Sequence, residues 1–412
     1  MIHVNRHVLP NGLRIVHAED TSTQMVALNL LYNVGARDEH PEHTGFAHLF
    51  EHLMFGGSVN IPDYDMPVQN AGGENNAWTN NDITNYYITL PRQNVETGFW
   101  LESDRMLGLD FNLQSLEVQR QVVIEEFKQR TLNKPYGDAP SLIREMAYKS
   151  HPYRWSTIGK EIGHIANATL DEVKDFFYRH YAPNNAILAV TGHISFDETV
   201  RLAEKWFGPI PSRDISERNL PAEEPQTAVR RQTVERKVPV DTLYMVFHMC
   251  NRYDNDYYVF DMLTDILANG RSSRLIMDLV HKKQLFTSVD AYISGSLDSG
   301  LLHITGKPAP GISLEEAEKA VWEELEALKT TPLETYEIEK VKNRFESEQI
   351  FGNINYLNVA TNLAFYELVN KAEDINTEVE RYRSVTPQRV QEVACRTFIP
   401  ENCCILYYKA LS

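Results

Sequence analysis

Three ionisable side chains within the segment 48–52 have the types and spacing of a metal site. His48, Glu51 and His52 stand at positions i, i+3 and i+4 of an apolar stretch, 46–55. In an α-helix these positions share one face, and the two imidazoles lie about 6 Å apart along the helix axis. That separation lets both imidazoles bind one zinc ion at about 2.0–2.1 Å. Glu51 lies on the same stripe, where a carboxylate can take a proton from a water molecule.

The competing interpretation is that these three residues are unrelated polar groups on a solvated helix face. Against it, the neighbouring residues of the stretch 46–55 are almost all apolar, so the helix is expected to be buried. Burying three ionisable groups costs too much free energy unless they are paired or bind a metal. The sequence therefore predicts a zinc site on this helix.

A catalytic zinc site usually has three protein ligands and one open position. The segment 116–130 has no glycine or proline and is predicted to be a helix, and it offers Glu125 and Glu126. Glu125 stands three residues after Val122, and Glu126 stands three residues after Val123, so apolar periodicity does not separate the two acids. A solvated pair of charges without any metal role fits the spacing equally well.

These residues need a scaffold, and the first half of the chain is predicted to be mixed α and β. Apolar runs favour strands, and the two runs that flank the turn at 80–82 favour a β-hairpin. A helix is expected after Thr169, which is a suitable N-cap followed by two acids in the first turn. The strands are expected at 13–18, 25–33, 75–79, 83–90 and 186–190, and this helix at 169–180.

The end of the first half is repeated at the end of the chain. Residues of the segment 169–185 recur at a constant offset, for example Thr169 at Thr386 (386 − 169 = 217). Because a helix, a turn and a strand recur in the same order, we interpret the chain as two similar domains in tandem. A charged stretch with several prolines and few apolar residues lies between them and is typical of a linker. The predicted domains are 1–208 and 226–412, with the linker at 209–225.

Composition limits the classes of function. The chain has 412 residues, of which 42% are hydrophobic and 24% charged, as in ordinary globular proteins. Its net charge of −17 makes it a poor partner for nucleic acid or for an anionic membrane, since both require an excess of lysine and arginine. Four cysteines, two of them adjacent, favour a reducing compartment. Because neither a leader peptide nor an apolar run of about 18 residues is found, we expect a cytoplasmic protein.

The segment 48–52, HLFEH, has the inverted zinc motif of the inverzincins. With its surroundings, the sequence resembles the pitrilysin/insulinase family, and most closely the zinc-bearing subunit of its mitochondrial-processing-peptidase-like branch. The matching stretches follow the order of the family and extend over essentially the whole chain. They are NGLRIV at 11–16, GFA at 45–47, GG at 72–73, NAWT at 76–79, VVIEE at 122–126, HPY at 151–153, YAPNNA at 181–186 and GRSSRL at 270–275.

This resemblance implies a fold, a set of site residues and an activity. The implied fold is α+β, with two tandem homologous domains that each contain a mostly antiparallel sheet packed with helices and together form half of a clam-shell. The implied site holds one zinc ion on His48, His52 and Glu126, with Glu51 as the general base. Asn76 and Ala77 are expected on an edge strand that pairs with a peptide substrate. The implied activity is that of a zinc endopeptidase.

Two departures from the family pattern bear on this activity. A glutamate that many members have seven residues before the third ligand is replaced by Gln119, which can form hydrogen bonds but carries no charge. The arginine and tyrosine that hold substrate carbonyl groups in active members are replaced by Val280 and Thr287. We therefore expect a homologous partner subunit that supplies the missing pair, with a heterodimer or a homodimer as the working unit. The chain alone is expected to be nearly inactive.

Two other classes of function compete with a peptidase. A non-catalytic structural or assembly subunit of the same family is the main alternative, and the intact motif at 48–52 argues against it. A metal-dependent hydrolase that acts on a non-peptide substrate is disfavoured by the edge-strand residues Asn76 and Ala77.

Overall fold

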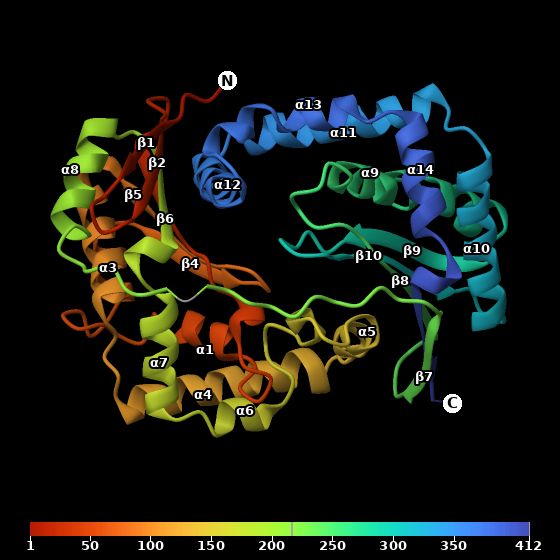
Figure 1. Cartoon of the computed structure of the whole chain (residues 1–412), viewed down its shortest axis with the longest axis horizontal. Coiled ribbons are helices and arrows are strands. Elements are labelled where there is room, and N and C mark those ends of the chain that lie inside the picture. Colours follow the sequence, from red (N-terminus) through yellow and green to blue (C-terminus); the bar gives the residue numbers. More distant parts are fainter. Residues whose placement is uncertain (216, 412) are drawn as a thin grey trace. The chain divides into compact units, whose positions relative to one another are not determined.

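The computed structural model describes residues 1–215 and 217–411 and contains two compact units. The first unit consists of Met1–Gln129, Trp155–Pro221 and Ile350–Thr377. The second unit consists of Arg130–Arg154, Ala222–Gln349 and Glu378–Ser412. Each unit contains one β-sheet packed with helices (Figure 1), which confirms the predicted α+β class.

The sheet of the first unit has six strands in the order β1-β2-β6-β3-β5-β4. The neighbours β2 and β6 run parallel, and the other neighbouring pairs are antiparallel. The strands predicted in this half are present, and β4 and β5 form the predicted hairpin. The bounds are β1 Asn5–Val8, β2 Arg14–Glu19, β3 Met25–Tyr32, β4 Glu74–Thr79, β5 Thr84–Pro91 and β6 Ala186–Gly192.

Alternate residues of this sheet face two different helix layers. On β3, Leu28 and Leu30 belong to one apolar core, while Ala27 and Leu31 belong to another. This period of two is expected for a strand that is buried on both faces. The first core includes α1 Phe46–Leu53, α2 Asp65–Asn70, α3 Val95–Leu107, α4 Leu113–Phe127, α6 Ile162–Ala166, α7 Leu170–His180 and α8 Phe196–Trp206, and the second includes α12 Tyr356–Val369.

The sheet of the second unit has five strands in the order β7-β11-β8-β10-β9. Here β7 and β11 run parallel, and the other neighbours are antiparallel. The strands are β7 Arg230–Arg236, β8 Thr242–His248, β9 Phe286–Ile293, β10 Leu301–Pro308 and β11 Cys403–Ala410. One core contains α9 Tyr257–Leu267, α10 Leu314–Thr330, α11 Thr335–Gly352, α13 Glu378–Ser384 and α14 Pro387–Thr397, and another contains α5 Ala139–Ala147.

The two sheets repeat one topology. The order β2-β6-β3-β5-β4 in the first unit recurs as β7-β11-β8-β10-β9 in the second, with the parallel pair in the same place. Equivalent elements keep the predicted offset, since β5 begins at Thr84 and β10 at Leu301 (301 − 84 = 217). The helices α7 and α14 begin at Leu170 and Pro387, which differ by the same number (387 − 170 = 217). The structure confirms the predicted tandem duplication.

The same offset of 217 residues relates α5 and α12, and each of these helices packs on the sheet formed by the other half of the sequence, an arrangement called the exchange below. α5 begins at Ala139 and α12 at Tyr356 (356 − 139 = 217). α5 comes from the first half of the sequence but packs on the sheet of the second unit, and α12 comes from the second half but packs on the sheet of the first. The division into 1–208, 209–225 and 226–412 stays a prediction. At one point the chain leaves the first unit after Pro221 and enters the second at Ala222, and this point lies inside the predicted linker.

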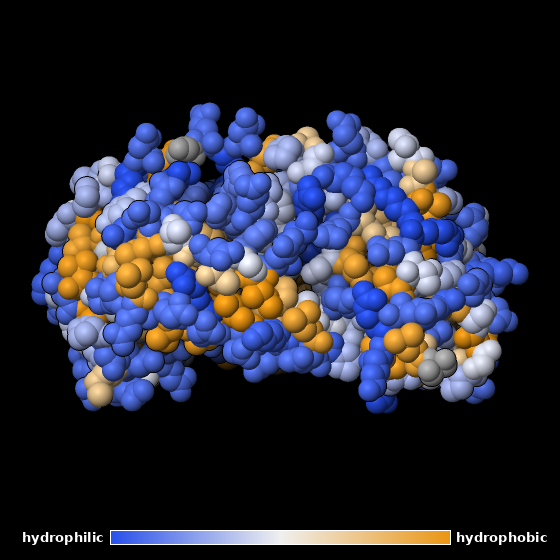
Figure 2. Space-filling view, turned by 90° about the horizontal axis from the view of Figure 1, so that it is seen from below, coloured by the Kyte–Doolittle hydropathy of each residue, from blue (hydrophilic) through white to orange (hydrophobic). Residues whose placement is uncertain are grey.

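On the face in Figure 2, hydrophilic side chains are interspersed with separate apolar patches. In the described part of the chain, no helix combines the length and the apolar character needed to cross a membrane. The four cysteines are free thiols, and Cys403 and Cys404 are buried in the second unit.

Candidate metal centre

The helix α1 carries two of the candidate ligands and is buried along most of its length. It begins after Gly45, whose φ of 91° is a left-handed conformation that favours glycine. The side chains of Phe46, Leu49 and Phe50 pack in the first-unit core. The helix ends at Leu53, shortly before the pair of glycines at 56–57.

The helix α4 brings a third candidate ligand to α1. Its N-terminus is capped by the Asn112 side chain, which accepts a hydrogen bond from a main-chain amide at 2.7 Å. Val123 is fully buried, and Glu126, one turn later, has a side chain that is 19% exposed. The Glu125 side chain is 58% exposed and pairs with Lys128 at 2.6 Å. The packing of α4 therefore separates two glutamates that the sequence pattern could not distinguish.

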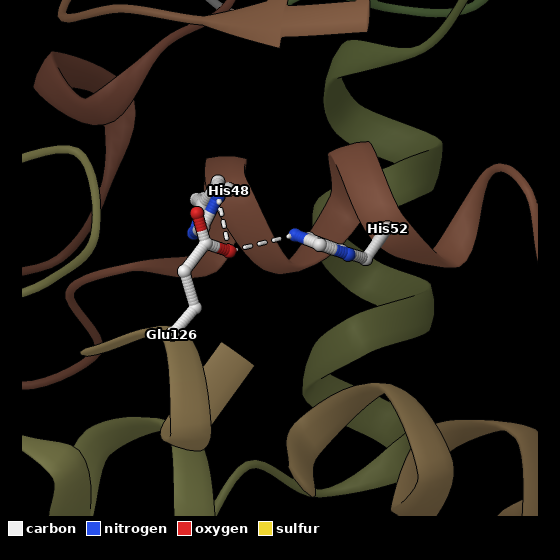
Figure 3. Close-up of side chains that lie close together, drawn as sticks. All are labelled: His48, His52 and Glu126. Atoms are coloured by element: carbon white, nitrogen blue, oxygen red, sulfur yellow. Dashed lines mark ion pairs between the residues drawn. The ribbon is translucent and has the colours of Figure 1, made fainter. Parts of the chain in front are cut away.

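The side chains of His48, His52 and Glu126 converge from α1 and α4 (Figure 3). Glu126 Oε2 lies 3.4 Å from His48 Nε2 and 3.2 Å from His52 Nε2. Two ligands that each lie about 2.0–2.1 Å from a tetrahedral zinc ion are about 3.3–3.4 Å apart. The two imidazoles and the carboxylate therefore fit zinc in number, chemistry and spacing. With 9% of the His48 side chain and 25% of the His52 side chain exposed, solvent reaches one side of the cluster.

Glu51 lies on α1 between the two histidines and is partly buried. Its charge acts on two buried phenols: burial raises the pKa of Tyr86 and of Tyr181, and the nearby Glu51 carboxylate raises both further. The Tyr86 hydroxyl donates a hydrogen bond to the main-chain oxygen of Phe50 at 3.4 Å. Glu51 is therefore close enough to two buried tyrosines to affect their pKa, and one of them, Tyr86, is hydrogen-bonded to the main chain of α1.

Asn76 and Ala77 lie on β4, at the edge of the first-unit sheet. On the inner side of this strand, Asn76 pairs with Tyr87 of β5 and Ala77 pairs with Tyr86. Among the described residues, no strand pairs with the outer side of β4. Because α1 packs beside β4, an extended peptide added to that edge would pass near the metal-site helix.

The remaining candidates lie on α4 and in the second unit. Gln119 lies on α4, two turns before Glu126. Its side-chain amide is close to the end of α1, because a Cβ atom added to Gly56 would lie 3.7 Å from the amide nitrogen of Gln119. Val280 packs against the core of the second unit. Thr287 lies on β9 and donates a hydrogen bond to a main-chain oxygen of β10 at 3.2 Å. Neither residue carries a guanidinium or a phenol that could hold a substrate carbonyl group.

Glu39 also contacts α1, although no sequence pattern indicates it. Its carboxylate accepts hydrogen bonds from the main-chain amides of Gly45 and Ala47. Known capping motifs place the acid within the first turn of the helix itself. Glu39 lies six residues before Gly45, beyond the reach of such a motif, and three-dimensional folding brings it back to the helix.

Two family models match most of the chain. Residues 14–161 match the model described as insulinase (peptidase family M16), and residues 167–345 match the model described as peptidase M16 inactive domain. The chain belongs to the insulinase family of peptidases, M16. The four residues His48, Glu51, His52 and Glu126 all fall in the first of these matches.

Individual proteins and solved structures that are similar to this chain agree with this family assignment. The chain is 29% identical over 381 residues to the zinc protease PqqE of Helicobacter pylori, covering 90% of this chain and 85% of that protein. It is 27% identical over 209 residues to the beta subunit of the mitochondrial-processing peptidase of Saccharomyces cerevisiae, covering 50% of this chain and 45% of that one. The crystal structure of a protease from Helicobacter pylori has a TM-score of 0.92 at 27% identity and covers 99% of this chain and 100% of that chain. The periplasmic protease PqqL from Escherichia coli shares the fold, with a TM-score of 0.81 at 19% identity, over 99% of this chain and 48% of that chain.

Proposed function

We propose that this protein is a zinc-dependent endopeptidase subunit that hydrolyses peptides or unfolded polypeptide segments. The observation that carries the proposal is the convergence of His48, His52 and Glu126 at the spacing of zinc ligands, with Glu51 on the same helix. The names of similar proteins, a zinc protease and a processing peptidase, support the same class of reaction.

Each residue has one role in the proposed reaction. His48, His52 and Glu126 hold one zinc ion per chain, which when bound supplies a Lewis acid for the scissile carbonyl group and for water. Glu51 takes a proton from the attacking water and passes it to the leaving amine. The main chain at 76–77 on β4 holds the peptide in an extended conformation, so recognition depends little on the side chains of the substrate.

The reaction also requires groups that this chain lacks. At the two positions where the family places an arginine and a tyrosine, it has Val280 and Thr287, and neither stabilises an oxyanion by charge. We propose that a homologous subunit supplies this pair in a heterodimer, since a second copy of the chain would bring the same valine and threonine. Two comparisons support a two-part enzyme. The yeast relative is named as a subunit, and this fold accounts for 48% of the PqqL chain.

The test is to purify the chain alone and together with a homologue encoded beside it. Both samples are assayed with a mixed peptide library, and their zinc content is measured. We expect one zinc ion per copy of this chain in both samples. Strong cleavage is expected only in the sample that also contains the homologue. Glu51→Gln should retain zinc and lower kcat by about 100-fold or more, because the general base is lost.

Other outcomes would contradict parts of this proposal. Full peptidase activity of the lone chain would exclude the partner requirement, and cleavage that survives Glu51→Gln would exclude the mechanism. A chain without zinc, or with zinc that His48→Ala does not remove, would favour the non-catalytic assembly subunit.

We also propose a cytoplasmic location for this protein. Its four cysteines are free thiols, and one of them, Cys395, is exposed, which suits a reducing compartment. Fractionation of cells with an antibody to the chain tests this proposal, and recovery outside the cytoplasmic fraction would contradict it.

A further inference from the structure

Glu39 is a buried acid at the start of the helix that carries two candidate metal ligands. It is 6% exposed, and its two carboxylate oxygens accept hydrogen bonds from the amides of Gly45 at 2.9 Å and Ala47 at 2.8 Å. These amides belong to the beginning of α1, where a helix leaves N–H groups without partners inside the helix. Burial raises the pKa of Glu39 well above its usual range, and the two amide hydrogen bonds act in the opposite direction.

The helix α1 depends on such support because it is short. It has eight residues, and helices of this length are unstable by themselves. Its N-cap position is occupied by Gly45, which offers no side chain for a capping hydrogen bond. Glu39 therefore supplies the cap from outside the helix. Since Ala47 directly precedes His48, any shift of this first turn also shifts a metal ligand.

The loop that contains Glu39 is also bound to the turn of the β4–β5 hairpin. The amides of Ala36 and Arg37 donate hydrogen bonds to the main-chain oxygens of Asn80 and Asn81 at 3.1 and 2.8 Å. The Arg37 side chain pairs with Asp82 at 3.2 Å, and both of these side chains are 5% exposed. The loop 36–39 thus contacts the hairpin at one end and the metal-site helix at the other.

We propose that Glu39 is a positioning residue that fixes the helix α1 relative to the edge strand β4. It contacts neither the metal site nor the peptide edge and acts through the first turn of α1. The inference rests on the proposed function, because it matters to catalysis if zinc binds on α1 and the peptide binds on β4. Without the carboxylate, the loop stays attached to the hairpin through Arg37 and Asp82, but the start of α1 loses its attachment to the loop.

The test compares Glu39→Gln with Glu42→Gln in the full chain, together with its partner subunit. Glutamine keeps the size of Glu39, but its NH₂ group cannot accept a hydrogen bond, so one of the two contacts to α1 is lost. We expect the zinc affinity, measured by competition with a chelating dye, to fall about tenfold. At saturating zinc, kcat should also fall about tenfold with little change in KM, because peptide binding to β4 is retained. Glu42 is an exposed acid next to the same loop, and its replacement should change neither quantity.

The outcomes separate this inference from the function on which it rests. A folded Glu39→Gln chain with wild-type zinc affinity and kcat would overturn it. An unfolded Glu39→Gln chain would also overturn it, because Glu39 would then serve stability alone. Partial recovery of zinc affinity in Glu39→Asp, which keeps the carboxyl group on a shorter side chain, would support it. A wild-type chain that binds no zinc would overturn the proposed function and this inference with it.

Discussion

Glu125 and Glu126 are adjacent acids on α4 with opposite surroundings, and this difference can be tested directly. Glu126 lies 3.2 Å from His52 Nε2, whereas Glu125 pairs with Lys128 at the surface. We predict that Glu126→Gln lowers the zinc affinity by about 100-fold or more, because a neutral amide is a poorer zinc ligand than a carboxylate. Glu125→Gln should leave the zinc affinity unchanged in the same titration.

This pair of variants also controls for damage to the helix itself. Both substitutions change one carboxylate to an amide on adjacent positions of α4, so a general loss of helix stability would affect the two chains alike. Equal loss of zinc from both variants would argue that α4 as a whole, and not a ligand, had been disturbed. Loss from Glu125→Gln alone would reassign the third ligand.

At the scale of single residues, the sequence predicts which side chains one helix places next to each other. The spacing of His48 and His52 follows from helix geometry, so both were predictable as neighbours. The choice between Glu125 and Glu126 depends on packing, because each follows a valine by three positions. Val122 is 44% exposed whereas Val123 is fully buried, and the chain alone contains no signal for that difference.

At the scale of elements, the loop 149–151 of the second unit surrounds one acid with main-chain amides. The amides of Lys149, Ser150 and His151 donate hydrogen bonds to the Glu223 carboxylate at 2.8 to 3.0 Å. Burial acts to raise the pKa of Glu223, but these hydrogen bonds outweigh it and the pKa is lowered overall. A group with a lowered folded-state pKa stabilises the fold above its unfolded pKa, and this contribution is lost as the pH falls through the folded value.

We therefore predict that Glu223→Gln destabilises the second unit in a pH-dependent way. Near neutral pH, the free energy of unfolding should fall by about 1 kcal/mol, a value that allows for partial exposure to solvent. The difference from wild type should be constant above about pH 5 and should shrink as the pH is lowered further. Urea denaturation at several pH values measures it, with Glu224→Gln at an exposed neighbouring position as the control. A difference that does not depend on pH would contradict this account.

The elements themselves were largely predictable, whereas the contacts between distant loops and helices were not. The helix α1, the β4–β5 hairpin and the capped helix α7 follow from local patterns of apolar residues, turns and caps. Glu39 and Glu223 each bind main-chain amides of another segment, and nothing in the sequence near those acids specifies which segment that is. Local sequence determines whether a segment forms a helix, a strand or a turn, whereas long-range packing determines which other segment it contacts.

At the scale of the whole molecule, the exchange of α5 and α12 makes each unit depend on the other half of the sequence. The side chains of Ala27, Leu31 and Ile187 on the first-unit sheet are at most 1% exposed, and they share a core with α12. Residues repeated at a fixed offset predict the duplication. They do not predict the exchange, because an apolar helix face can cover either of two similar sheets.

This exchange predicts that α12 stabilises the unit that contains the candidate metal site, although it is far from that site in sequence. Leu363 of α12 is fully buried against the first-unit sheet, so Leu363→Ala should lower the free energy of unfolding by about 2–5 kcal/mol. Hydrogen exchange should increase in β2, β3 and β6, which contact α12. Ile354→Ala, at a 71% exposed position before the same helix, should change neither measurement. Increased exchange confined to the second unit would contradict the prediction.

A fragment that ends at residue 208 gives the strongest test of the exchange, because it retains His48, Glu51, His52 and Glu126 but loses α12. Its sheet would expose the apolar face that α12 covers, and α5 would have no second-unit sheet to pack on. We predict that this fragment aggregates or binds zinc much more weakly than the full chain, because two large apolar surfaces become exposed. A synthetic peptide of residues 350–377 should restore part of the zinc affinity, whereas a peptide of residues 314–330, taken from α10, should not. A monomeric fragment 1–208 with the zinc affinity of the full chain would instead establish the first half as an autonomous domain and show that α12 is dispensable to the site.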